Sequence, residues 1–279
     1  MNFNRRLLAM LAIVSGLLAV AGAYAQSPTI PNFFDPAARF TKPDVSGLQR
    51  LRFLTVTDFP PFSYVDDRKR LVGFHVELAQ AICEELDIEN VCEIQALPFA
   101  ELEPALGRGE GEALMAGLAI TADTRKRLDF TLPYFRLPAR FLVRGDARID
   151  APLGSSLSGR TVAVLEGTAH AAFLRRFFQR VTVQTHKTRE AALASLKQDK
   201  AQAVFGDALP LANAIASDPT LRFAGGPFLD PRFFGHGLAI ALRPEDDGLR
   251  QALNFALVAL NDSGRFEELY LRHFPVGIF

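Results

Sequence analysis

Segments that alternate between strand-like and helix-like patterns dominate this 279-residue chain and restrict its fold to a layered α/β architecture. The first series begins at residue 51. Its strand patterns are at 51–56, 91–96 and 112–117, a helical pattern is at 73–83, and a short helix begins at 102–106. Strands that alternate with helices of this length indicate one α/β lobe.

The same alternation of strand and helix patterns occurs again in the second half of the chain. Its strand patterns are at 159–165, 180–185 and 201–206, and its helical patterns are at 169–178 and 188–196. We therefore expect two α/β lobes. Ligands of such sheets bind beyond the carboxyl ends of strands, so the residues that follow the strands of both lobes should meet in one cleft. We expect this of the residues that come after Val56, Met115, Leu165 and Phe205.

The N-terminus predicts export of the protein. Two arginines precede an unbroken run of apolar and small residues at 7–21, and Ala23-Tyr24-Ala25 has small residues where a signal peptidase recognises them. We expect a signal peptide at 1–25 and a periplasmic location; an uncleaved membrane anchor is the alternative. Residues 26–49 contain four prolines and no apolar period, which predicts an extended leader.

Charge and histidine content exclude several classes of partner. Lys plus Arg and Asp plus Glu both number 31, so no net field attracts nucleic acid or an anionic membrane. The five histidines show no ligand spacing, and two cysteines are too few for a closed zinc site. We expect neither a metal nor a cofactor.

The two cysteines, Cys83 and Cys92, flank the end of a predicted helix and the turn that follows it. An oxidising compartment favours a disulfide between them, and such a small loop would stabilise the fold by about 2–3 kcal/mol. Two free thiols are the alternative.

Six motifs follow one another along the chain: DFPPFSY at 58–64, GFHVELA at 73–79, AGLAIT at 116–121, DFTLPY at 129–134, GRTVAVLEGT at 159–168 and GD at 206–207. In their order and spacing the chain resembles the family-3 extracellular solute-binding proteins, the polar amino-acid-binding proteins of bacterial ABC importers, over nearly all of residues 50–276. The cysteine pair also falls where the lysine/arginine/ornithine- and histidine-binding members carry their disulfide.

The resemblance implies a periplasmic-binding-protein fold with a discontinuous first lobe. That lobe would comprise residues 50–140 and 237–279, and the second lobe residues 141–236. The apolar runs at 140–143 and 235–240 are assigned to the two strands that cross between the lobes. The lobes would close on a ligand as a monomer, and a membrane permease would recognise the closed form.

The resemblance also assigns roles to two polar residues that follow strands of the second lobe. Asp207 matches the aspartate that binds the ligand's ammonium, and a side-chain N-cap for the next helix is the alternative. Thr168 matches the residue that offers its N–H and hydroxyl to the ligand's carboxylate, and helix N-termini favour anions. Plain N-capping is the alternative role of Thr168.

Two aromatic residues of the first lobe, Phe59 and Phe99, match the positions that sandwich the ligand side chain; each has ordinary core packing as its alternative. His170 either reaches the cleft or is an exposed residue in the first turn of a helix. Four further positions are assigned to ligand binding, namely Ala116, Gly117, Leu165 and Ala169.

One departure from the family pattern concerns the arginine that clamps the ligand carboxylate. The family places it where this chain has Thr124, and Arg125 follows directly. We expect Arg125 to act as the clamp, because its side chain is long and its planar fork suits a carboxylate; an ion pair with Asp123 or Asp129 is the alternative. Ala119 stands where relatives place a hydroxyl, so a less polar pocket and an apolar or atypical ligand are expected.

Three functions compete at this point. The first is a transport-associated binding protein for an amino acid or a similar small anion, which the motifs favour. The second is an enzyme that resembles cyclohexadienyl dehydratase, although His170 stands where its catalytic glutamate is expected. The third is a sensory or partner-binding module that is not linked to transport.

Overall fold

A computed structural model describes residues 34, 40–118, 120–274 and 278–279 of the chain. The predicted signal peptide and most of the leader lie outside these residues. Leader residues 40–49 are described, and the ring of Phe34 packs edge-on against Phe266 of helix α10 (Arg265–His273) at 6.0 Å. Within the described ranges, every helix is too short or too polar to cross a membrane.

The first lobe is built on a five-stranded sheet with the order β5-β1-β6-β13-β7. Strand β1 runs parallel to its two neighbours, β5 and β6, whereas β13 is antiparallel to β6 and β7. The strands are β1 (Leu51–Thr55), β5 (Cys92–Ala96), β6 (Ala113–Leu114), β7 (Asp129–Phe130) and β13 (Ala241–Leu242). A small antiparallel sheet consists of β2 (Asp58–Phe59), β3 (Ser63–Val65) and β4 (Leu71–Val72).

The helices of the first lobe come from both ends of the chain. The first of these helices, α2, packs against the last two, α9 and α10. They are α2 (Phe74–Glu85), α3 (Phe99–Gly107), α9 (Asp247–Asp262) and α10, with short 3₁₀ helices η1 (Glu89–Val91) and η2 (Thr124–Lys126). Buried phenylalanines hold this packing: Phe74 contacts Phe135, Phe266 and Phe274 at ring distances of 5.1–6.0 Å.

The second lobe has its own five-stranded sheet, with the order β10-β9-β11-β8-β12. Strands β10, β9 and β11 are parallel, and β8 is antiparallel to β11 and β12. The strands are β8 (Ala139–Arg144), β9 (Thr161–Leu165), β10 (Thr182–His186), β11 (Ala203–Asp207) and β12 (Leu221–Phe228). The helices are α4 (Leu153–Ser156), α5 (Ala169–Phe177), α6 (Arg189–Lys197), α7 (Ala208–Ser217) and α8 (Pro231–Phe234).

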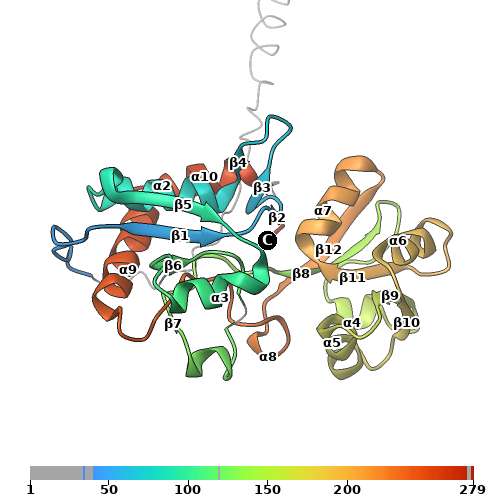
Figure 1. Ribbon diagram of the computed structural model, residues 1–279. Coiled ribbons are helices and arrows are strands. Elements are labelled where there is room, and N and C mark those ends of the chain that lie inside the picture. The colour runs from blue at the N-terminus through green and yellow to red at the C-terminus, as the bar shows by residue number, and fades with distance from the viewer. Residues whose placement is uncertain (1–33, 35–39, 119, 275–277) are drawn as a thin grey trace, which may run out of the picture.

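Two antiparallel segments, 131–138 and 235–240, connect the lobes (Figure 1). The Tyr134 amide donates to the Leu238 carbonyl at 2.9 Å, and the Leu238 amide donates to the Phe135 carbonyl at 2.7 Å. The second segment is the predicted crossing. The first predicted crossing is wrong, because residues 140–143 pair with β11 and β12 inside the second sheet. An apolar run is typical both of a strand buried inside a sheet and of a strand that crosses between lobes. The composition of residues 140–143 therefore could not distinguish these two placements.

The predicted two-lobed periplasmic-binding-protein fold is confirmed, since each lobe has its own sheet and its own core of buried apolar side chains. In the second core, Phe141 packs on Phe205 at 4.4 Å, and Phe173 packs on Phe205 at 5.6 Å. Truncation of one such ring to Ala costs about 3–5 kcal/mol. The exact division of the chain into separately moving lobes stays a prediction.

The predicted disulfide is confirmed in the structure: Cys83, in the last turns of α2, bonds to Cys92, the first residue of β5. The two Cα atoms are 6.3 Å apart. The bond ties the end of the helix to the edge strand of the first sheet.

We expect Cys83→Ser with Cys92→Ser to lower the free energy of unfolding by about 2–3 kcal/mol, because the unfolded chain regains the entropy of the opened loop. Urea denaturation measures the difference. The wild-type chain in excess reductant serves as the control and should match the double variant. Equal stability of the oxidised wild type and the variant would contradict the expectation.

Candidate functional site

The carboxyl ends of the parallel strands β9 and β11, together with the start of helix α6, line one cavity of about 390 Å³ in the second lobe. Residues predicted for the site line it together: Leu165, Thr168, Ala169, His170 and Asp207. Leu137, from the first crossing segment, lines the same cavity, so this edge of the second sheet lies beside the connection between the lobes.

Asp207 is the last residue of β11 and holds the N-cap position of α7. Its carboxylate makes no capping hydrogen bond to that helix, so the predicted alternative is wrong for the side chain. The side chain is 43% exposed, and its Oδ1 lies 3.2 Å from Nε2 of His170. The end of β11 thus places a carboxylate at the cavity, and this carboxylate makes no capping hydrogen bond to helix α7.

His170 is not the exposed helix residue that one alternative predicted, because only 13% of its side chain is exposed. Its ring stacks on Phe234 of α8 at 5.1 Å and meets the edge of Phe205 at 5.7 Å. Although Nε2 is within ion-pair distance of Asp207, the geometry is not that of a hydrogen bond, and the described residues give this buried nitrogen no other partner. We therefore treat the contact as electrostatic only.

Thr168 caps helix α5, as its alternative role predicted. Its Oγ1 accepts a hydrogen bond from the Ala171 amide at 3.4 Å and donates one to the Leu165 carbonyl at 2.8 Å. Capping fixes the helix start at the cavity, where the first N–H groups of a helix have no intrahelical partner. A role of Thr168 toward a ligand stays a prediction.

The carboxyl edge of the first lobe presents aromatic and small residues. Phe59 follows β1 and stacks on Phe62 at 4.6 Å. Gly117 follows β6 at φ +72°, and a Cβ there would lie 2.7 Å from Phe59 Cε1. Phe99, at the start of α3 after β5, is 56% exposed, so its core alternative is wrong. Ala116 is buried beside Gly117, and Ala119 lies outside the described residues.

Arg125 belongs to η2 in the first lobe and is exposed. Its guanidinium lies over the ring of Phe130 at 5.7 Å. The predicted ion pairs are not formed: Asp123 pairs with Arg127 at 2.8 Å, and Asp129 lies 3.9 Å from Arg250. Among the described residues, no carboxylate forms a salt bridge with Arg125.

A buried polar pair that the sequence did not reveal lies next to Phe59 and Phe62. The Tyr134 hydroxyl and His75 Nε2 are 2.8 Å apart, and both residues are buried. The His75 ring lies 6.0 Å from Phe59 and 5.0 Å from Phe62. Burial lowers the pKa of His75 to about 3, so the imidazole is neutral at physiological pH.

The structure does not bring all predicted site residues together. The second-lobe cavity is lined by none of Phe59, Phe99, Ala116, Gly117 and Arg125. It is lined by residues that sequence reasoning missed, chiefly Arg189, Phe233 and Phe234. Arg189 follows the parallel strand β10, so the rule that located Asp207 could have found it, whereas the two phenylalanines gave no signal. The described residues contain no cluster of ligands suited to a metal ion.

Comparisons with known proteins place the chain in a family. Residues 51–276 match the family model of the bacterial extracellular solute-binding proteins, family 3, and the chain belongs to that family.

Among its relatives, an Escherichia coli (strain K12) protein, named as a candidate arginine-binding protein of an ABC transporter, is 32% identical over 81% of this chain and 91% of its own length. The histidine-binding periplasmic protein of Salmonella typhimurium is 26% identical over 83% and 90%. The solved structure of an ancestral cationic amino acid solute-binding protein is 26% identical over 81% and 96%, with a TM-score of 0.62.

We expect Gly117→Ala to destabilise the fold by about 1–3 kcal/mol, because the added Cβ collides with Phe59 and φ is positive. Gly107→Ala is the matched control: it ends helix α3, nothing lies near the added Cβ, and the change should be neutral or slightly stabilising. Thermal denaturation compares the two. Equal melting temperatures for Gly117→Ala and the wild type would show that Phe59 has room to move.

Proposed function

We propose that this protein is the periplasmic solute-binding component of an ABC importer and captures an amino acid, or a similar small anion, by closure of its two lobes. The observation that carries the proposal is the carboxylate of Asp207, which faces a cavity at a strand end beside the start of helix α5. The membership of family 3 and the relatives named for binding arginine and histidine support it.

The second lobe supplies complementary groups for a zwitterion. Asp207 would bind the ammonium, because a positive charge buried in a closed cleft needs an anionic partner. The N–H groups of Ala169 and His170, at the start of α5, would bind the carboxylate, since helix N-termini favour anions. Thr168 holds that helix start in place.

The first lobe would cover the ligand's side chain. Phe59 and the exposed ring of Phe99 lie at the carboxyl edge of its sheet, where parallel strands end. Closure would bring this aromatic edge over the cavity of the second lobe and exclude water. A permease would then recognise the closed monomer. Export by the predicted signal peptide would bring the chain to the periplasm.

An enzymatic role has less support than transport. A general acid would have to be positioned in the cleft. Glu166, the acidic residue in the turn before α5, is exposed and does not line the cavity. The family consists of solute-binding proteins, and we propose that this chain binds without converting its ligand.

The test is a thermal-shift screen of the wild-type chain against each proteinogenic L-amino acid, followed by calorimetry on those that stabilise it. A ligand at 100 times its Kd should add about 2.7 kcal/mol to the free energy of unfolding. Asp207→Asn should weaken binding by about 2–5 kcal/mol, because the ammonium loses its charged partner.

Asp67→Asn, at an exposed turn of the first lobe, is the matched control and should bind as the wild type does. The absence of a shift with every amino acid would overturn the proposed function. Unchanged affinity in Asp207→Asn would remove the ammonium assignment.

A further inference from the structure

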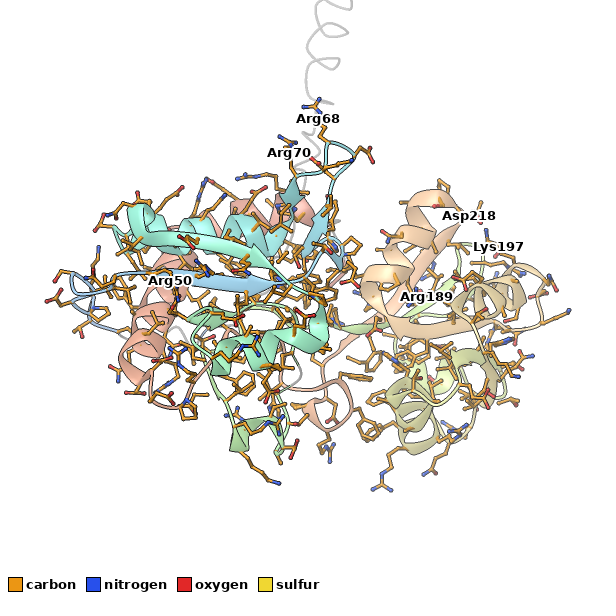
Figure 2. The ribbon with its side chains drawn as sticks, in the orientation of Figure 1. Arg50, Arg68, Arg70, Arg189, Lys197 and Asp218 are labelled. Carbon is orange, nitrogen blue, oxygen red and sulfur yellow. A yellow bond between two sulfur atoms is a disulfide. The ribbon has the colours of Figure 1, made fainter. Side chains whose placement is uncertain are left out.

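Three neighbouring strands of the second lobe each deliver a polar group to the same cavity. Strands β10, β9 and β11 lie side by side and run parallel, so their carboxyl ends share one edge of the sheet. Thr168 follows β9, Asp207 ends β11, and Arg189 follows β10 as the first residue of α6. Arg189 is labelled in Figure 2, in the second lobe. All three line the cavity.

Arg189 is free to take an anionic partner. It is exposed, and within the described part of the chain no carboxylate forms a salt bridge or hydrogen bond with it. Many other surface arginines here are paired, as Arg144 is with Asp199 at 3.0 Å and Arg232 is with Asp230 at 2.7 Å. Arg189 therefore does not have to break an existing ion pair before it binds a ligand.

The cavity is therefore lined by one guanidinium and one carboxylate. Asp207 is its only lining carboxylate among the described residues, and Arg189 is its only lining guanidinium. Helices α5 and α6 both begin at this edge, which adds positive potential. The rest of the wall is largely apolar and includes Phe205 and Phe234. One anion and one cation in an apolar cavity match the charge pattern of an α-amino acid.

We infer that Arg189 binds the carboxylate of the ligand and thereby performs, from the second lobe, the clamping role that the sequence pattern assigned to Arg125. A planar guanidinium can donate two parallel hydrogen bonds to a carboxylate. Arg125, in contrast, lies over Phe130 on the first lobe and does not line the cavity. The inference rests on the proposed function, because it needs a ligand with a carboxylate.

The consequence is that the second lobe alone holds both charged groups of the ligand. Asp207 takes the ammonium and Arg189 takes the carboxylate before the lobes close. The first lobe then contributes Phe59 and Phe99 to the ligand's side chain, without a charged clamp. The order of events is capture by the second lobe, followed by covering by the first.

The experiment compares a bound L-amino acid with its α-carboxamide, in which the negative charge alone is removed. The probe is each L-amino acid that stabilises the wild-type chain, and calorimetry gives the ratio of the Kd of the amide to the Kd of the acid. Arg189→Ala should weaken binding of the acid by roughly 10- to 100-fold and lower this ratio by about tenfold or more, since the lost partner is specific to the carboxylate.

Lys187→Ala is the matched control, because Lys187 is equally exposed, precedes Arg189 by two residues and does not line the cavity. Its ratio should equal that of the wild type. Arg189→Gln is a second variant that keeps a polar side chain without the charged guanidinium, and it should resemble Arg189→Ala.

A wild-type ratio in Arg189→Ala would overturn the inference and leave the proposed function intact. A collapse of the ratio in Arg125→Ala alone would return the clamp to the first lobe. If no L-amino acid bound the wild-type chain, the proposed function would fail, and the assignment of Arg189 would fail with it.

Discussion

The backbone pairing between the two crossing segments forms the connection beside which the candidate cavity lies. Leu238 exchanges hydrogen bonds with Tyr134 and Phe135 in a short antiparallel bridge, and beyond it one segment enters β8 while the other leads to β13. Leu137, on the first segment, lines the second-lobe cavity, so the strand ends of that lobe lie against the connection. Figure 1 shows β1 running toward the same middle region from the first lobe. We propose that these two segments form the hinge about which the lobes close.

Under the proposed function, electrostatics would decide which lobe holds the ligand first. The second lobe presents a carboxylate, a guanidinium and two helix starts around one cavity, whereas the edge of the first lobe presents rings and small residues. In the structure, His170 Nε2 lies 3.2 Å from the Asp207 carboxylate without a hydrogen bond. Under the proposed function, this contact would leave Asp207 available to a ligand's ammonium. Aromatic packing of His170 on Phe234 keeps the imidazole from swinging into solvent.

The sequence predicted the fold class, the disulfide and the gathering of Thr168, His170 and Asp207, because strand periodicity is a local signal and the carboxyl ends of parallel strands lie at one edge of a sheet. It misplaced the first crossing, since residues 140–143 are apolar for burial inside a sheet and not for a hinge. It could not place Phe234, which reaches the cavity through a four-residue helix after β12. Nor could it reveal the His75 and Tyr134 pair, whose partners are 59 positions apart and meet only through tertiary packing.

Closure of the two lobes on a ligand can be measured by small-angle X-ray scattering. The measurement compares the radius of gyration of the wild-type chain alone and with a saturating concentration of the L-amino acid that gives the largest thermal shift. We expect a smaller radius with ligand, because closure about the crossing segments brings the aromatic edge of the first lobe onto the second. Identical scattering curves in the two states, with binding established by calorimetry, would contradict closure and indicate a rigid binding module.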